Sequence, residues 1–241
     1  MKRIFDIIVS MSILIFLSPL ILLALFFIWF EDKHSPIYKA PRVGQNGRSF
    51  TMYKMRTMIV NADKSGVDST STGDPRITRI GSAIRKLKLD ETLQFINVLI
   101  GSMSVVGPRP NVHSEVTLYS KEESKILNLK PGITDFSSVV FSDLGDILKD
   151  SPDPNLCYNQ LVRPWKSRFA LAYIEHSSMT VDLAICFATG VSLFSRKSAL
   201  AIITKTLRAL NMKEELVVCS MRTVPLEPTA PPGFDSVVLR R

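Results

Sequence analysis

Residues 7–30 read IIVSMSILIFLSPLILLALFFIWF, an apolar run that Ser18 and Pro19 interrupt near its midpoint. At ~1.5 Å per helical residue, this run is long enough to cross the ~30 Å hydrocarbon core of a bilayer. Proline removes a backbone donor and clashes with the preceding turn, and the Ser18 hydroxyl can bond a carbonyl that the break frees. The pattern therefore predicts a membrane helix with a break in its middle.

Positive charge flanks this apolar run on both sides. Lys2 and Arg3 precede it, and Lys33, Lys39 and a basic remainder of the chain follow it. A straight crossing would put positive charge on both faces of the membrane, whereas a re-entrant hairpin leaves both flanks in the cytoplasm. The residues alone leave a proline-kinked signal anchor equally open. We expect the run to stay in the mature protein, because it exceeds the apolar region of a signal peptide and lacks a small-residue cleavage site.

Composition places the chain at a membrane surface in a reducing compartment. The 241 residues leave room for one sizeable domain after the membrane segment, and the net charge of +8 suits anionic headgroups and phosphorylated ligands. The same charge could serve nucleic acid, but no base-reading motif supports that class. Cys157, Cys186 and Cys219 lack CxxC spacing, so neither a disulfide framework nor a zinc site is indicated.

The remainder of the chain predicts a helix-rich α/β domain. Strands are expected at 37–43 and 49–55, joined through Asn46-Gly47, because this pair supplies the positive φ angles of a tight hairpin. The polar residues 61–75 predict a mobile loop that could act as a lid. Hydrophobic spacing predicts helices over 78–87, from 89 to a stop at Gly101, over 154–175 and over 181–194, and residues from 131 fit a short strand or an extended loop.

The C-terminal part of the chain has a different composition. Residues 196–216 form a basic amphipathic stretch that could lie on anionic lipid or pack on its own domain. Four prolines from Pro225 to Pro232 predict a disordered tail. We therefore divide the chain into a membrane helix over 1–32, a main domain over 33–194, and an amphipathic helix with a tail over 195–241.

Two acidic residues in a basic context are the first candidates for chemistry. Asp90 and Glu91 open the predicted helix and follow Arg85, Lys86 and Lys88. At a helix start both carboxylates can lie near free amide donors, where phosphates also bind, so that one could hold a divalent metal while the other acts. An ordinary helix cap followed by a first-turn glutamate explains the same residues.

Basic residues elsewhere could bind a diphosphate. Arg109 lies between two prolines in Gly107-Pro108-Arg109-Pro110, and a rigid arginine suits a bidentate grip. Lys54 and Arg56 alternate along the second strand, so both point to one face, with Arg42 on the partner strand. A surface turn and an exposed basic face are equally ordinary explanations.

Read in order, these segments are more specific than any one of them. The chain resembles the small monotopic phosphoglycosyl transferases of the bacterial sugar transferase family from its first residue to about 194. The matching residues are Lys2-Arg3-Ile4-Phe5-Asp6, Ser18-Pro19, Arg42-Val43-Gly44, Tyr53-Lys54-Met55-Arg56-Thr57-Met58, Asp74-Pro75-Arg76-Ile77-Thr78-Arg79-Ile80-Gly81, Leu89-Asp90-Glu91, Asn97-Val98-Leu99, Gly101-Ser102-Met103-Ser104, Gly107-Pro108-Arg109-Pro110 and Lys130-Pro131-Gly132-Ile133-Thr134.

The resemblance implies a fold and an activity. The fold would be a re-entrant helix-break-helix in the cytoplasmic leaflet of the bacterial inner membrane, carrying a compact α/β domain that faces the cytoplasm. The activity would be transfer of a sugar 1-phosphate from a UDP-sugar to undecaprenyl phosphate with release of UMP, which begins a surface glycan. The expected partners are the donor, the acceptor and the membrane, with room for a homodimer and for downstream glycosyltransferases, and no nucleic acid.

The resemblance also implies roles for individual residues. Asp90 falls at the position of the nucleophile that forms a covalent phosphosugar intermediate. Glu91 matches the second acid of the dyad and, with Asp90, would hold Mg2+. Arg85 and Arg109 match phosphate-binding arginines, and Lys54 and Arg56 are assigned to substrate binding beside them.

The chain departs from the family pattern at two places. Thr92-Leu93 replaces the usual Leu-Pro after the dyad, although Gln94 is retained. Asp135-Phe136-Ser137-Ser138 replaces a Gly-Trp-Ala-Gln run, which leaves the donor sugar open. A catalytically silent membrane adaptor of the same fold is the alternative function, and an anchored nucleic-acid binder is a third that only net charge supports.

Overall fold

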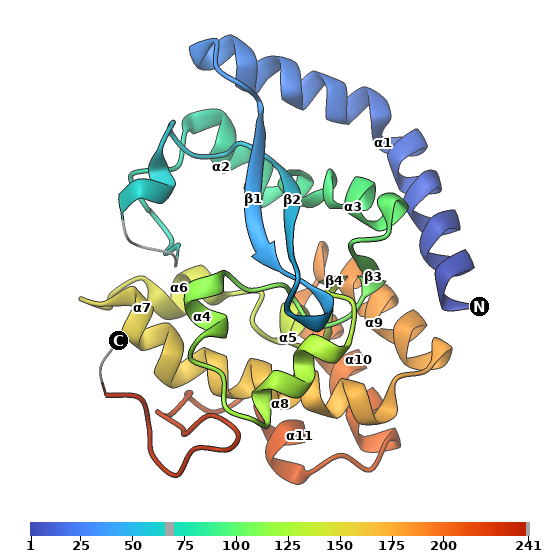
Figure 1. Ribbon diagram of the computed structural model, residues 1–241, viewed down its shortest axis with the longest axis vertical. Helices are drawn as coiled ribbons and strands as arrows, with labels where there is room; N and C mark the ends of the chain where they lie inside the picture. The colour runs from blue at the N-terminus through green and yellow to red at the C-terminus, as the bar shows by residue number, and fades with distance from the viewer. Residues whose placement is uncertain (66–69, 240–241) are drawn as a thin grey trace.

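The computed structural model describes residues 1–65 and 70–239 and shows helices around two small two-stranded sheets (Figure 1). The helices and strands are α1 (Lys2–Asp32), β1 (Ile37–Val43), η1 (Gln45–Gly47), β2 (Ser49–Met55), η2 (Ala62–Ser65), α2 (Arg79–Lys86), η3 (Leu89–Glu91), α3 (Gln94–Ile100), β3 (Ser104–Val106), α4 (His113–Val116), η4 (Glu123–Asn128), β4 (Gly132–Thr134), α5 (Phe136–Val140), α6 (Leu144–Leu148), α7 (Pro154–Cys157), the π-helical η5 (Tyr158–Val162), α8 (Arg163–His176), α9 (Met179–Ser192), α10 (Arg196–Ala209) and α11 (Glu214–Met221). This is the helix-rich α/β class that the sequence predicts.

Helix α1 continues through its proline and bends near its midpoint (Figure 1). Pro19 has no N–H to donate to the carbonyl of Ile15, four residues earlier. The Ser18 hydroxyl donates to that carbonyl at 2.8 Å, as the sequence predicts. The helix is long and apolar enough to cross a membrane, and most of its apolar window is exposed on the protein. It is therefore suited to contact lipid along most of its length.

The first sheet is the predicted hairpin. Strands β1 and β2 pair antiparallel, with Ile37 opposite Met55 and Val43 opposite Ser49. Asn46 and Gly47 adopt φ angles of 57° and 73°, which confirms the positive φ angles expected of this turn. Figure 1 shows the hairpin running from the end of α1 to the centre of the molecule, with α2 and α3 drawn on either side of its upper half.

The segment that carries Asp90 differs from the sequence prediction. The predicted helix through Asp90 and Glu91 begins only at Gln94, and the two acids lie in the single 3-10 turn η3. Lys88 has a φ angle of 53°, which reverses the chain after α2. This reversal allows Leu89 to be buried against α1 while the two carboxylates stay partly exposed. The predicted stop at Gly101 is confirmed, with a φ angle of 90°.

The second sheet fixes the segment around Arg109. Strand β3 pairs in parallel with β4, so the open choice at residue 131 resolves to a strand. The backbones approach so closely that a Cβ added to Gly132 would lie 2.1 Å from the Gly107 nitrogen. The Gly107 N–H donates to the Thr134 carbonyl at 3.0 Å. The turn that carries Arg109 is therefore held against β4.

The polar segment 61–75 contains the short helix η2, and residues 66–69 lie outside the described residues. The expectation of a lid there remains a prediction. In the C-terminal part, Leu200, Ile203 and Leu207 of α10 are buried in the main core. Of the two interpretations of the amphipathic stretch, the structure favours a helix that packs on its own domain.

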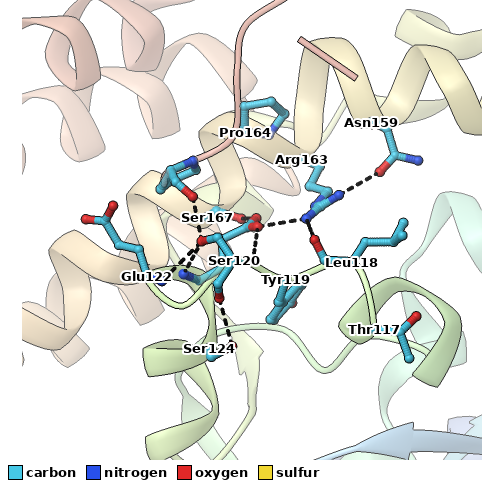
Figure 2. Close-up of polar contacts among 12 residues, drawn as sticks. Thr117, Leu118, Tyr119, Ser120, Glu122, Ser124, Asn159, Arg163, Pro164 and Ser167 are labelled. Carbon is cyan, nitrogen blue, oxygen red and sulfur yellow. Dashed lines mark hydrogen bonds and ion pairs between the residues drawn. The ribbon is translucent and has the colours of Figure 1, made fainter. Parts of the chain in front are cut away.

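A buried ion pair joins α8, through Arg163 (Figure 2), to the first residue of η4. Arg163 NH2 lies 2.7 Å from Glu123 Oε2, and the two side chains are 3% and 0% exposed. Arg163 also donates to the Leu118 carbonyl, and Ser167 donates to Glu123 Oε1 at 2.6 Å. Because both charges are buried, each depends on the other for compensation.

The chain after α11 differs from the predicted disordered tail. Residues 223–239 contain neither helix nor strand, but they bind the domain at several points. Thr229 N–H donates to the Gln160 carbonyl at 3.1 Å, and Ser120 Oγ donates to the Pro232 carbonyl at 2.6 Å. Gln160 Nε2 donates to the Val238 carbonyl at 2.8 Å. The composition of this segment predicts disorder because the segment has few apolar residues. It does not indicate the hydrogen bonds that the segment forms with Ser120 and Gln160, which are distant in sequence.

Candidate functional site

Glu91 is the centre of a cationic cluster built from three elements. Lys54 on β2 lies 2.9 Å from Glu91 Oε1. Arg109 reaches both oxygens of Glu91, with NH2 2.6 Å from Oε1 and NH1 3.0 Å from Oε2. Burial opposes the charge on Glu91, but Arg109 and Lys54 hold the pKa of its carboxyl well below the usual range. Glu91 is therefore a fixed anion.

Asp90 is adjacent in sequence and differently placed. Its carboxylate accepts a hydrogen bond from its own backbone N–H, but no other side chain in the described part of the chain forms a hydrogen bond or ion pair with it. Burial and the neighbouring charge of Glu91 raise the pKa of Asp90, against the opposing effect of Lys54 and Arg85. Because its pKa is raised and no other side chain engages it, the Asp90 carboxylate is more basic than that of Glu91. The structure thus gives the two acids different properties.

Arg85 lies beside the dyad on the last turn of α2. Its Nε donates to Thr57 Oγ1 at 2.8 Å, and its two terminal nitrogens take no part in this bond. Burial lowers its pKa, and the charge of Asp90 partly restores it. Helix α2 packs tightly here, because a Cβ on Gly81 would lie 2.1 Å from the Thr57 carbonyl oxygen. The segment that carries Lys54 therefore also positions Arg85.

Arg109 is fixed from its other side by groups that the sequence argument did not assign. Its NH1 donates to the Ile133 carbonyl on β4 and, at 3.4 Å, to Gln94 Oε1. Gln94 is fully buried, and its Nε2 has no hydrogen-bond partner among the described residues. The sequence feature that could have identified Gln94 is its position three residues after Glu91, about one helical turn along the chain. Four contacts therefore hold the guanidinium in one orientation.

Arg56 lies outside this cluster. Its guanidinium forms a forked ion pair with Asp32, at the end of α1, with distances of 2.6 and 2.7 Å. Its Nε donates to the Ser35 carbonyl at 2.7 Å. The structure thus brings Lys54, Arg85 and Arg109 to the dyad and places Arg56 at the membrane helix.

A narrow cavity adjoins Arg109. Its wall is formed by Pro108, Arg109, Asn111, Tyr119, Ile126, Asp135, Ser137, Tyr158, Arg163, Lys166, Ser167 and Ala170. Asn111 Nδ2 donates to the Tyr119 hydroxyl at 2.7 Å on this wall. Asp135 and Ser137 belong to the run that departs from the family pattern. The departure therefore lies in the cavity beside the anion-binding arginine.

The carboxylates fit a magnesium ion that takes few protein ligands. No group of three or more histidine, cysteine or acidic side chains gathers in the described part of the chain. Magnesium is commonly bound by one or two carboxylates together with substrate phosphates and water. Asp90 offers both oxygens, and Glu91 Oε2 accepts one bond where an oxygen can accept two. The dyad could therefore hold the ion only together with a ligand such as a diphosphate.

Charged residues near the start of α1 attach the membrane helix to the domain, a role that the sequence argument did not give them. Lys2 lies 2.5 Å from the buried Asp182 on α9. Arg3 donates to the Val98 carbonyl, and the buried Asp6 accepts from the Val105 N–H at 3.0 Å. The family resemblance already included Lys2-Arg3-Ile4-Phe5-Asp6. Their partners are distant in sequence, so the sequence alone did not indicate this role.

Comparison with known proteins gives a family. The family model described as "Bacterial sugar transferase" matches residues 1–196. The chain is 34% identical over 203 residues to "Exopolysaccharide production protein ExoY" of Sinorhizobium fredii, covering 78% of this chain and 83% of that protein.

Two further relatives are named for a reaction. The chain is 32% identical over 191 residues to "UDP-N-acetylgalactosamine-undecaprenyl-phosphate N-acetylgalactosaminephosphotransferase" of Aeromonas hydrophila, covering 78% of this chain and 42% of that protein. It is 34% identical over 202 residues to "UDP-glucose:undecaprenyl-phosphate glucose-1-phosphate transferase" of Klebsiella pneumoniae, covering 82% of this chain and 41% of that protein. The chain thus spans about two fifths of the length of these longer relatives.

Proposed function

The chain belongs to the bacterial sugar transferase family, and on that premise we propose that it transfers a sugar 1-phosphate from a UDP-sugar to undecaprenyl phosphate and releases UMP. Two relatives are named for this type of reaction with different sugars. The cationic cluster around the dyad supplies the charge that a diphosphate needs. The product would be an undecaprenyl diphosphate sugar, the starting unit of a surface glycan.

The first step uses Asp90 as the nucleophile. A carboxylate oxygen of Asp90 attacks the phosphorus that carries the sugar, and the bond from that phosphorus to the UMP oxygen breaks. UMP leaves with both electrons of that bond, and the sugar phosphate stays esterified to Asp90. The observation that carries this role is the difference between the neighbours: Glu91 accepts from two cations, whereas the Asp90 carboxylate has no partner among the described side chains.

Glu91 and the basic residues orient the donor. Arg109 is held by Glu91, Gln94 and Ile133 and would offer the diphosphate the N–H groups that these bonds leave free, while Lys54 and Arg85 add positive charge. Magnesium held by Asp90 and Glu91 would neutralise diphosphate charge and stabilise the departing UMP. The wall that carries Asp135 and Ser137 would contact the donor beyond the diphosphate and contribute to the choice of sugar.

The second step returns the enzyme to its starting state. An oxygen of the undecaprenyl phosphate attacks the same phosphorus, and the bond to the Asp90 oxygen breaks. Because the acceptor's phosphate lies at headgroup depth, a fixed insertion depth brings it to Asp90 without a search in solution. The membrane helix provides that depth.

The attachments of α1 support a re-entrant helix in the cytoplasmic leaflet. Lys2 and Asp6 bind the domain at one end of α1, and Asp32 binds it at the other. At ~1.5 Å per residue a straight helix of this length would hold its ends farther apart than the ~30 Å hydrocarbon core. One domain that grips both ends is suited to a helix that enters and leaves by the same face.

The test is release of UMP from a panel of UDP-sugars by membranes that contain the protein and undecaprenyl phosphate. We expect one donor or a few to yield UMP and a lipid-linked sugar diphosphate. Asp90→Asn should abolish release, and release by this variant equal to that of the wild type would overturn the assignment. An absence of UMP from every donor would overturn the proposed activity itself.

A further inference from the structure

We propose that Arg56 is a positioning residue: its ion pair with Asp32 fixes the end of the membrane helix to the strand that carries Lys54, and so sets where the lipid phosphate meets Asp90. This inference rests on the proposed function, because it assigns Arg56 to the acceptor step of that reaction. It replaces the substrate contact expected for Arg56 from the sequence.

Asp32 and the backbone carbonyl of Ser35 together engage every nitrogen of the Arg56 guanidinium. NH2 lies 2.6 Å from Asp32 Oδ1, and NH1 lies 2.7 Å from Oδ2. Nε donates to the Ser35 carbonyl, and NH1 also contacts the Met58 carbonyl at 3.4 Å. The arginine side chain is only 10% exposed. A guanidinium already engaged on all three nitrogens has little left to offer a diphosphate.

Asp32 occupies an unfavourable place for an acid, which points to its partner as the reason. It is the last residue of α1, where the helix dipole favours cations, and the last turn holds no basic residue. Lys33 follows in the left-handed region, and its ammonium lies over the rings of Trp29 and Phe30 at 4.2 and 4.0 Å. The carboxylate of Asp32 is thus balanced by Arg56, across the gap to β2.

The residues on both sides of Arg56 contact the dyad or an arginine beside it. Two positions earlier, Lys54 bonds to Glu91. One position later, the Thr57 hydroxyl accepts from Arg85. A segment of four residues therefore carries, in order, a bond to the dyad, a bond to the membrane helix and a bond to a phosphate-binding arginine. Movement of the α1 end relative to this segment would change the height of Asp90 above the lipid.

Apolar packing reinforces the same connection. Ile21, Ala24 and Ile28 of α1 are buried in one cluster with Leu89 and Leu93, which flank the dyad in sequence. Apolar contacts alone are non-directional, whereas a forked ion pair fixes both distance and orientation. The ion pair is therefore the part of this interface that can set a register.

The experiment separates the two half-reactions. In the first, the protein in nanodiscs receives the UDP-sugar without acceptor, and one UMP per enzyme is counted. In the second, undecaprenyl phosphate is added and transfer is followed. Asp32→Asn and Arg56→Gln should leave the first half-reaction unchanged and lower kcat/KM for the lipid acceptor by about tenfold to a hundredfold, the effect expected of a small misplacement.

Two variants serve as controls. Glu31→Gln removes the same charge one residue away, from an exposed side chain on the same helix end, and should match the wild type. The exchange Asp32→Arg with Arg56→Asp should recover part of the acceptor step. A short-chain polyprenyl phosphate in detergent, which needs no fixed depth, should be used equally well by all variants.

Two results would overturn the inference. Equal losses in both half-reactions would return Arg56 to the donor site, and no loss in either would leave the pair without a role in positioning. Hydrogen exchange over residues 54–58 gives a readout independent of activity and should accelerate in Arg56→Gln but not in Glu31→Gln. If the wild type releases no UMP, the proposed function fails. Independently of that result, unchanged hydrogen exchange over residues 54–58 in Arg56→Gln would refute the positioning role of the Arg56–Asp32 pair.

Discussion

Arg109 and Glu91 form a forked ion pair in which NH2 lies 2.6 Å from Oε1 and NH1 lies 3.0 Å from Oε2. The fork joins the turn after β3 to the 3-10 turn that carries the dyad, and Lys54 adds a second cation to the same carboxylate. One acid is thereby committed to holding the arginine and lysine in place. Its neighbour Asp90 has no such side-chain partner in the described part of the chain, and we therefore propose it as the nucleophile.

We expect Arg109→Lys to lower UMP release by about a hundredfold, because an ammonium cannot reproduce the fork that grips both Glu91 and a diphosphate. The measurement is single-turnover UMP release at saturating donor. Arg48→Lys, at an exposed arginine of the hairpin turn, is the control and should retain full activity. Wild-type release by Arg109→Lys would show that the fork is not needed.

The two acids should respond differently to amide substitution. Asp90→Asn should leave no covalent adduct, because an amide is a poor nucleophile. Glu91→Gln should still form the adduct but more slowly, since it keeps the shape of the side chain and loses the charge that orients Arg109. Intact-protein mass spectrometry after incubation with donor distinguishes these outcomes. A covalent adduct on the Asp90→Asn variant would show that another residue is the nucleophile.

Helix α1 should present both ends to the cytoplasm. Ile4→Cys and Lys39→Cys, each in a background without the native cysteines, should both resist an impermeant thiol reagent in intact cells and react after lysis. Both positions are exposed on the protein, so shielding by the fold does not explain resistance. Labelling of the first position alone would establish a straight crossing.

Asp74 should stabilise the protein only above acidic pH. The bond from Arg76, opposed by burial, lowers the pKa of Asp74, whose side chain is 7% exposed. A depressed folded-state pKa means that the contribution is complete above the unfolded pKa of ~3.9 and is lost as pH falls through the lower folded value. Asp74→Asn should therefore lower Tm at neutral pH, with a difference that shrinks below about pH 4. A Tm difference for Asp74→Asn that stays constant with pH would refute the linkage.

The Glu123–Arg163 pair should be costly to break from either side. Glu123→Gln leaves a buried guanidinium without its counter-charge, and we expect a loss of roughly 3 kcal/mol in the free energy of unfolding. Arg163→Met combined with Glu123→Leu removes both charges and should cost less than the single change. Denaturant unfolding in detergent compares them, and a double variant less stable than Glu123→Gln would contradict this account.

Local sequence patterns were sufficient for several elements of the fold. The hairpin through Asn46 and Gly47 and the stop at Gly101 follow from the conformational limits of single residues, whereas the break predicted at Ser18 and Pro19 is only a bend in a continuous helix. Such limits act within a few residues, so they can be read without knowing the fold. The resemblance predicted that Lys54, Arg56, Arg85 and Arg109 bind substrate beside the dyad. The structure brings all of them there except Arg56, and their part in binding substrate remains a prediction.

Only the tertiary structure decided what each charge does. Lys54 and Arg56 are alternate residues with the same sequence signal, yet one binds Glu91 and the other binds Asp32 at the end of α1. The same holds for Asp90 and Glu91, which share a turn but not their partners. The sequence by itself determined a bent apolar helix, a hairpin and a basic site with two acids, because these depend on neighbours along the chain. The division of roles among the charges depends on which distant segments pack together, and that is a property of the folded chain alone.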